Sequence, residues 1–330
     1  MLAAMDLPAQ RNPVGAHVPV AGRGLAGTGL AYARRVGAEA VQVFVANPRG
    51  WATPPGDPRQ DEAFREACAG AGIPAYVHAP YLINFGSGSD ATRERSTESL
   101  RHSLHRAHAI GALGVVVHTG SALCGPREAA LAHVRAQVLP LLDELDARGD
   151  DAPRLLLEPT AGQGSSLCGR MADLADYAAA LDHHPRLGIC LDTCHAFAAG
   201  HDLAAPGGTA RMLEELADAV GPGRLGLIHA NDSEDVVGAR KDRHANIGAG
   251  HIGTAAFAEL LAHPATAGVP LIIETPDGRH DPQRVEGARH ALDITRLKEL
   301  RLPADRPAAA PSTGGARPSA RGTVPAGLPG

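Results

Sequence analysis

Aromatic residues are scarce in this chain, because phenylalanine, tryptophan and tyrosine together make up 3% of its 330 residues. Glycine, proline, alanine and arginine are abundant instead, a bias that we attribute to base composition rather than to function. Hydrophobic residues still account for 44% of the sequence. The chain is therefore long and apolar enough to bury a sizeable core despite its few rings.

The sequence also lacks long apolar runs and paired cysteines. No stretch approaches the roughly 18 apolar residues of a membrane-spanning helix, so we expect no such helix. An odd number of scattered cysteines without a signal peptide favours free, buried thiols in a reducing compartment, so we expect a cytoplasmic protein. These cysteines are Cys68, Cys124, Cys168, Cys190 and Cys194.

An excess of positive charge is missing as well. The formal net charge is −5 at pH 7, so charge alone gives no reason to expect nucleic-acid binding. Divalent cations bound at one place would change that balance locally.

Short apolar runs alternate with segments of helical periodicity such as 96–112 and 127–147. This alternation predicts a parallel sheet covered by helices. Eight such units favour a (β/α)8 TIM barrel. A doubly wound open sheet is the alternative, and the lack of a glycine-rich phosphate motif after the first run weakens it. The eight runs are 13–18, 41–46, 75–80, 114–120, 154–160, 187–193, 225–232 and 270–275.

The composition divides the chain into three parts. We expect a flexible N-terminus over 1–12, a barrel domain over 13–302, and a disordered tail over 303–330. The tail is dominated by alanine, proline, glycine, serine and threonine. It has almost no large apolar side chains and cannot offset the entropic cost of ordering.

Histidine, aspartate or glutamate ends six consecutive apolar runs or follows them closely. A single residue of this kind is usually structural, for example as a helix cap. In a TIM barrel, however, the carboxyl ends of the strands share one rim. Four carboxylates and five imidazoles gathered there would be unfavourable without a counter-charge. The nine residues are His78, His118, Glu158, Asp192, His195, His229, Asp242, His244 and Glu274.

Divalent metal ions would supply that counter-charge. Imidazole and carboxylate donors suit Zn²⁺, Mn²⁺ or Fe²⁺. His17 lies at the same rim, and we expect it to support ligands rather than to be one. The histidines expected at the solvated surface are His102, His105, His108, His183 and His184.

Several long motifs resemble the endonuclease IV family of apurinic/apyrimidinic endonucleases, also called AP endonuclease family 2. The resemblance extends from about Gly15 to about Leu297, with the motifs in the family's order. The segment 191–202 resembles the family signature. The motifs are "GAHV", "YLINFGSG", "HTGS", the segment 158–169, "LDTCHAFAAGHD", "HANDSE", "KDRHANIGAGHIG" and "PLIIETP".

The resemblance implies a xylose-isomerase-like TIM barrel that holds three zinc ions, with Mn²⁺ or Fe²⁺ as an alternative at one site. Glu158 would bridge two of the ions and would be the central catalytic residue. The implied ligand sets are His78, His118 and Glu158; Glu158, Asp192, His229 and Glu274; and His195, Asp242 and His244.

The same resemblance implies a DNA repair function. Family members cleave the backbone 5′ to an abasic site and leave a 3′-hydroxyl and a 5′-deoxyribose phosphate, and we expect removal of 3′-blocking groups too. Divalent metals activate water and stabilise charge on the phosphate, so no protein general acid is required. The partner would be double-stranded DNA with abasic sites, bound by a monomer. Arg49 would enter the DNA stack, while Tyr81 and Leu82 would wedge into the minor groove.

Two departures from the family pattern and two alternative functions stay open. Pro159 stands where asparagine is usual, and Thr119 where proline is common. A sugar isomerase or epimerase of the related barrels would bind a single metal and need only four of the nine residues. A non-catalytic protein that binds abasic DNA would keep the DNA loops. The additional ligand-type residues argue against the first alternative, and the complete ligand set argues against the second.

Overall fold

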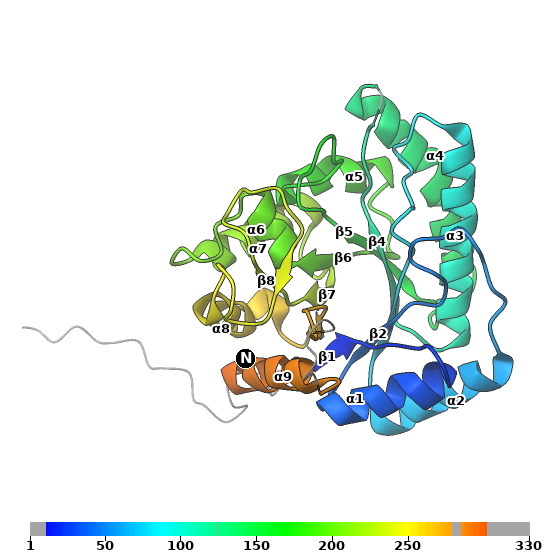
Figure 1. The fold of residues 1–330 in the computed structure, drawn as a ribbon. Helices are drawn as coiled ribbons and strands as arrows, with labels where there is room; N and C mark the ends of the chain where they lie inside the picture. The colour runs from blue at the N-terminus through cyan, green and yellow to red at the C-terminus, as the bar shows by residue number, and fades with distance from the viewer. Residues whose placement is uncertain (1–10, 124, 279–284, 302–330) are drawn as a thin grey trace, which may run out of the picture.

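The computed structural model describes residues 11–123, 125–278 and 285–301. Eight parallel strands close into a barrel in the order β1-β10-β7-β6-β5-β4-β3-β2, and helices surround them (Figure 1). The predicted TIM barrel is confirmed, and each predicted apolar run contains one barrel strand. The strands are β1 (Val14–His17), β2 (Val41–Val43), β3 (Ala75–His78), β4 (Gly114–His118), β5 (Arg154–Glu158), β6 (Leu187–Asp192), β7 (Leu225–His229) and β10 (Leu271–Ile273).

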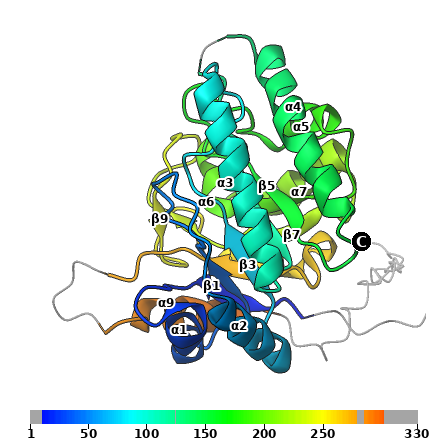
Figure 2. The ribbon, with the colours of Figure 1, turned by 90° about the vertical axis from the view of Figure 1, so that its right-hand side faces the viewer.

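The two segments with predicted helical periodicity lie in α3 (Asp90–Ala109) and α4 (Arg127–Asp146), which pack side by side outside the barrel (Figure 2). A short antiparallel ribbon of β8 (Asp232–Ser233) and β9 (His244–Ala245) follows β7. The helices are α1 (Leu30–Val36), α2 (Pro58–Ala71), α3 (Asp90–Ala109), α4 (Arg127–Asp146), α5 (Leu174–Ala180), α6 (Thr193–Ala199), α7 (Gly208–Val220), α8 (Thr254–Ala262) and α9 (Ala288–Leu300), with short helical turns η1 (Leu25–Gly29), η2 (Met171–Asp173) and η3 (Pro264–Thr266).

Side chains alternate between the two faces of each strand. Outward residues such as Val77, Val117 and Leu157 belong to the main core beneath the helices. A separate cluster, which we call the apolar layer, fills the barrel interior. Its residues are Ala40, Tyr76, Val116, Leu156, Cys190, Leu227 and Ile272.

The next inward position towards the carboxyl end of each strand is polar. Period-two alternation therefore places a polar layer directly on the apolar one. These residues, each two positions after a member of the apolar layer, are Gln42, His78, His118, Glu158, Asp192, His229 and Glu274.

The first and last described segments meet at the amino ends of the strands. Asn12 is buried, and its amide donates to the carbonyl oxygen of Val269 at 2.8 Å. Arg301 donates to the carbonyl oxygen of Asn12 at 2.6 Å. The expected flexible N-terminus and disordered tail lie mostly outside the described residues, at 1–10 and 302–330.

The described cysteines are buried and unpaired, as predicted, while Cys124 lies outside the described residues. None of the helices in the described part of the chain is long and apolar enough to cross a membrane. The five histidines expected at the surface do not line the pocket described below. His105 and His183 are exposed, whereas His102, His108 and His184 are half-buried.

Candidate metal centre

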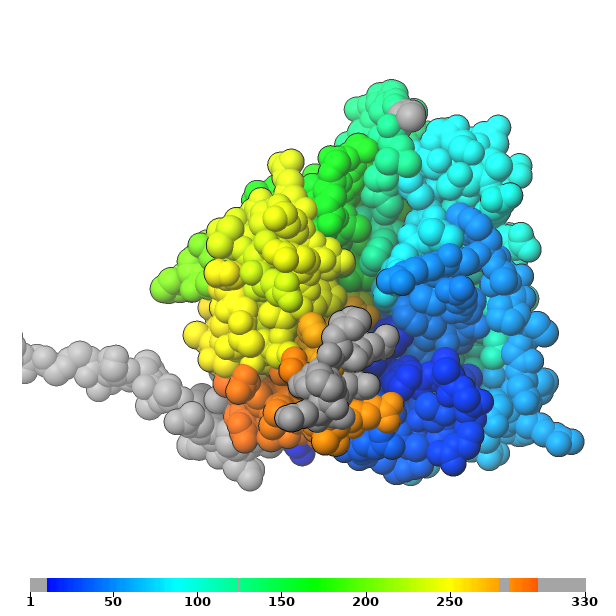
Figure 3. Space-filling view, viewed as in Figure 1, coloured from blue at the N-terminus to red at the C-terminus, as the bar shows by residue number. Residues whose placement is uncertain are grey.

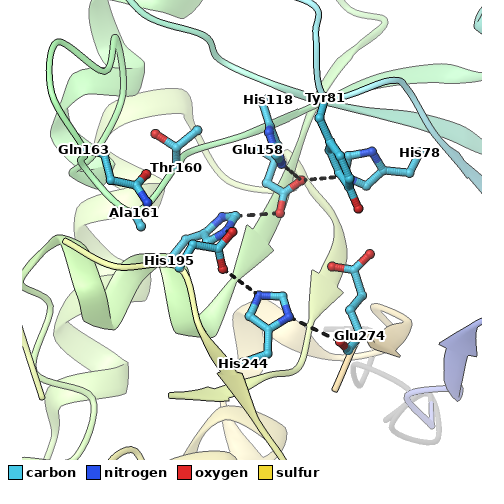
Figure 4. Close-up of a pocket in the computed structure, with 11 residues that line it drawn as sticks. His78, Tyr81, His118, Glu158, Thr160, Ala161, Gln163, His195, His244 and Glu274 are labelled. Atoms are coloured by element: carbon cyan, nitrogen blue, oxygen red, sulfur yellow. Dashed lines mark hydrogen bonds and ion pairs between the residues drawn. The ribbon is translucent and has the colours of Figure 1, made fainter. Parts of the chain in front are cut away.

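A cavity of about 310 Å³ opens at the carboxyl ends of the strands. In Figure 3 the surface is hollowed between the yellow segment, which includes the β8–β9 region, and the blue segment opposite. Figure 4 shows the side chains that surround the cavity. They are His78, Tyr81, His118, Glu158, Thr160, Ala161, Gln163, His195, Asp242, His244 and Glu274.

The structure brings all nine predicted metal-ligand residues together at this place. Seven of them line the cavity, and the remaining two, Asp192 and His229, are buried beside them in the polar layer. We call the nine residues the rim set. Eight of them form overlapping groups in which every ligand atom lies within 4.8 Å of the others, and Asp242 forms such a group with His244 and Cys194.

Glu158 occupies the middle of the rim set (Figure 4). Its carboxylate lies 3.2 Å from Nε2 of His78, 3.4 Å from Nε2 of His118 and 3.0 Å from Nδ1 of His229. The side chain is 1% exposed. Burial alone would raise the pKa of Glu158, but His229 and His118 hold that pKa well below its ordinary value. Glu158 is therefore a fully charged carboxylate shared between neighbouring groups.

Two of the implied ligand sets reappear as groups in the structure. One is formed by His78, His118 and Glu158, and the other adds Asp192, His229 and Glu274 to Glu158.

The third implied set is joined through Asp242, which lies 3.2 Å from Nε2 of His195 and 3.0 Å from Nε2 of His244. Asp192 also groups with these two histidines. Asp192 thus stands between the second and third sets, which the sequence motifs do not indicate.

Four of the five imidazoles have their outer nitrogen turned to an oxygen that can only accept. Nδ1 of His78 is 2.7 Å from the carbonyl oxygen of Ala79, and Nδ1 of His195 is 3.0 Å from that of Pro159. Nδ1 of His244 lies 3.3 Å from the carbonyl oxygen of Glu274. In each case the outer nitrogen donates. The inner nitrogen is then free to present a lone pair, which is the tautomer of a metal-ligating histidine.

Gln42 fixes His229 in the same kind of tautomer, in which the outer nitrogen donates and the inner nitrogen carries the lone pair. The amide nitrogen of Gln42 donates to Glu274 at 2.7 Å, so its amide oxygen faces Nε2 of His229 at 2.9 Å. Nε2 must donate to that oxygen, which leaves Nδ1 of His229 facing Glu158 and Glu274. A lone pair this close to a carboxylate is repulsive unless a proton or another cation lies between them.

Without another cation, the carboxylates of this centre favour protonated histidines. Burial alone would lower the pKa of His195, but Asp192 and Asp242 raise it well above its ordinary value. Burial would likewise lower the pKa of His244, yet Asp192 and Asp242 raise it to about 9. The four carboxylates of the rim set form ion pairs only with histidines within the described residues. This donor set fits divalent metal ions.

Comparisons with known proteins assign the chain to a family. A family model described as a xylose isomerase-like TIM barrel matches residues 30–299. A protein from Streptomyces coelicolor named probable endonuclease 4 is 68% identical over 292 residues, which cover 88% of this chain and 96% of that protein. A Streptomyces avermitilis protein of the same name is also 68% identical and is covered to 91%. The chain belongs to the endonuclease IV family.

Solved structures agree with this membership. Endonuclease IV from Thermus thermophilus is 34% identical, with a TM-score of 0.73, over 87% of this chain and 98% of that one. Sugar epimerase folds are also similar, for example a D-tagatose 3-epimerase-like protein at 18% identity and a TM-score of 0.62. At that identity the likeness concerns the barrel fold alone.

The sequence motifs of the endonuclease IV family did not reveal Gln42 and Asn231 as members of the centre. Asn231 is fully buried, donates to Asp192 at 2.8 Å and accepts from the backbone nitrogen of Glu274 at 2.8 Å. A polar residue inside an otherwise apolar strand is the signal that could have found Gln42. Pro159, the departure from the family pattern, still supplies its backbone oxygen to His195.

Of the residues that the endonuclease IV resemblance assigns to DNA, Tyr81 lines the cavity. Arg49 is exposed, and Tyr81 and Leu82 are 43% and 37% exposed. The backbone nitrogen of Tyr81 donates to the carbonyl oxygen of Pro48 at 2.9 Å, which joins the two loops. The ring of Tyr81 also stacks on His118, with centroids 5.5 Å apart and planes at 17°. Tyr81 therefore contacts the candidate ligands as well as the mouth of the cavity.

Proposed function

We propose that this protein hydrolyses the phosphodiester bond 5′ to abasic sites in double-stranded DNA, leaving a 3′-hydroxyl and a 5′-deoxyribose phosphate. We extend the proposal to the removal of 3′-blocking groups. Membership of the endonuclease IV family supports this function. The observation that carries it is the rim set, whose four carboxylates face imidazoles and no arginine or lysine in the described residues.

The rim set would hold about three divalent ions, chiefly zinc, with Mn²⁺ or Fe²⁺ as an alternative at one site. When bound, such ions lower the pKa of water and stabilise negative charge on a phosphate and on its leaving oxygen. The three ligand sets would be His78, His118 and Glu158; Glu158, Asp192, His229 and Glu274; and His195, Asp242 and His244.

The protein's own residues would hold the metal ions and orient the substrate. Glu158 would hold two of the ligand sets together, since four imidazoles lie within 3.4 Å of its carboxylate. The remaining cavity wall includes Thr160 and Gln163, which are neutral and would not repel a phosphate. Their polar groups can donate hydrogen bonds to phosphate oxygens.

Lesion recognition would be performed by two loops near the cavity. One contains Arg49 and the other contains Tyr81 and Leu82, and a backbone hydrogen bond joins them. Arg49 would enter the DNA stack, and Tyr81 and Leu82 would wedge into the minor groove while the Tyr81 ring packs on His118. An abasic site favours this arrangement because its stack is already interrupted. Intact DNA would have to be unstacked first.

The direct test compares two duplexes of identical sequence, one with a single abasic site and one intact, at one fixed salt concentration. We expect nicking of the abasic strand only, on its 5′ side, with a 3′ end that a DNA polymerase extends. The activity should disappear after chelation and return with zinc. Equal cleavage of both duplexes, or binding to the abasic duplex without any nicking by the metal-loaded protein, would contradict the proposal.

A further inference from the structure

A buried carboxylate outside every recognised motif joins two segments of the candidate metal centre. Asp293 lies on α9, is 3% exposed, and accepts three hydrogen bonds. Its Oδ1 accepts from the backbone nitrogen of Ile247 at 3.0 Å. Its Oδ2 accepts from the amide nitrogen of Asn246 at 2.7 Å and from the hydroxyl of Thr275 at 2.7 Å.

These donors stand next to two members of the rim set. Asn246 follows His244 by two residues, and Thr275 follows Glu274 directly. The two segments also touch each other, because Nδ1 of His244 donates to the carbonyl oxygen of Glu274 at 3.3 Å. Asp293 therefore occupies the junction between the segment that carries His244 and the segment that carries Glu274.

The helix that carries Asp293 makes a second hydrogen bond to the segment that carries Glu274. Nε2 of His290 lies 2.8 Å from the carbonyl oxygen of Thr275, so this nitrogen donates. Nδ1 of His290 must then accept from the hydroxyl of Tyr32, which is 2.9 Å away. Thr275 is thus held through both its backbone and its side chain by a helix that packs on α1 and β1.

We propose that Asp293 is a positioning residue that keeps His244 and Glu274 at a fixed separation, and so holds together the cations of the second and third ligand sets. This inference rests on the proposed metal centre. Hydrogen bonds beyond the ligands orient them, and removing such partners typically lowers metal affinity by about 10–100-fold. Asp293 acts on two ligand segments at once, through Asn246 and Ile247 on one and Thr275 on the other.

The substitution Asp293→Asn tests the inference. The amide keeps the shape of the side chain, but it offers one acceptor oxygen where the carboxylate offers two. Three donors face this side chain, so its NH2 group must meet at least one of them and leave it unpaired. The matched control is Glu299→Gln, which removes the same charge from an exposed position on the same helix.

Two measurements on the proteins as purified decide the outcome. The first is the rate of metal release to a chelator at a temperature well below the melting temperature of each variant. We expect Asp293→Asn to release part of its metal about tenfold faster or more, and Glu299→Gln to match the wild type. The second is amide hydrogen exchange at Ile247, which should accelerate in Asp293→Asn alone.

The results distinguish a positioning role of Asp293 from a purely structural one. A lower melting temperature with unchanged metal release and unchanged exchange would overturn the inference, because Asp293 would then be only structural. If Asp293→Asn does not fold, Thr275→Val takes its place, since it removes one donor and keeps the side-chain volume; unchanged metal release would again overturn the inference. A wild type without divalent metal would overturn the proposed function as well.

Discussion

Acidic residues have different ion-pair partners at the two ends of the barrel. At the amino ends of the strands, the half-buried Glu39 accepts from Arg301 at 2.7 Å, and Lys298 lies 3.3 Å away. At the carboxyl ends, the four carboxylates of the rim set face only imidazoles within the described residues. The partners of the carboxylates therefore distinguish a structural junction at one end from a candidate metal centre at the other.

The apolar layer between the two ends contributes to that difference. Its seven side chains pack inside the barrel directly beneath the polar layer. Apolar protein rather than water therefore lies under the rim set. Charges above this apolar protein are poorly screened, and each interaction with a cation is stronger than it would be in water. The following changes probe the two ends and the layer between them, from the largest expected effect to the smallest.

Glu158→Gln should have the largest effect, because it removes the charge at the middle of the rim set while keeping the side-chain shape. We expect nicking of an abasic duplex to fall by about 1,000-fold or more, and metal content to drop. Steady-state nicking and elemental analysis on the same preparation measure both. Near-normal nicking by Glu158→Gln would remove Glu158 from the chemistry.

Leu156→Ala tests the apolar layer. Leu156 is 1% exposed, and its methyl groups fill the space above Gly114, Gly188 and Gly226 of the neighbouring strands. We expect the free energy of unfolding to fall by about 2–5 kcal/mol, measured by denaturant titration, with metal content largely retained. The control is Leu292→Ala, since that side chain is 69% exposed. Equal losses for both variants would show that the layer does not support the barrel.

Arg49→Ala separates lesion binding from the metal centre. We expect binding to abasic duplex to weaken by roughly 1–3 kcal/mol, while metal content and binding to intact duplex change little. Equilibrium binding at one salt concentration measures this. Tyr81→Ala is less suited, because the Tyr81 ring packs on His118 and on His78. Unchanged preference for the abasic duplex in Arg49→Ala would assign lesion recognition to other residues.

Glu39→Gln probes the opposite end and should give the smallest effect. Burial alone would raise the pKa of Glu39, but the hydrogen bond from Arg301 holds that pKa below its ordinary value. Because the pKa is lower in the folded state, the charge of Glu39 contributes its full stability above the unfolded pKa of about 4.3. This contribution is lost as the pH falls through the folded pKa. Wild type should melt slightly above Glu39→Gln at pH 7, and the gap should close in acid. A gap that widens in acid would contradict the ion pair.

Much of the fold was predictable because apolar runs alternate with segments of helical periodicity along the chain. The eight apolar runs coincide with the barrel strands, and a ligand-type residue at a strand end such as His118 or Glu158 can be found by counting along one strand. Gln42 carries a similar signal, as a polar residue inside an apolar strand, whereas Asn231 and Asp293 could not be found in this way. Their roles depend on contacts between distant segments, for example α9 with the residues after β10, and no local spacing encodes such contacts.

The most direct test is the divalent metal content of the gently purified wild-type protein, determined by elemental analysis against accurately measured protein concentration. We expect about three ions per chain, mainly zinc, because the rim set offers three overlapping groups of imidazole and carboxylate ligands. A reproducible value near one would favour single-metal chemistry of the epimerase type. A protein that binds no divalent metal would contradict the assignment of the rim set as a metal centre.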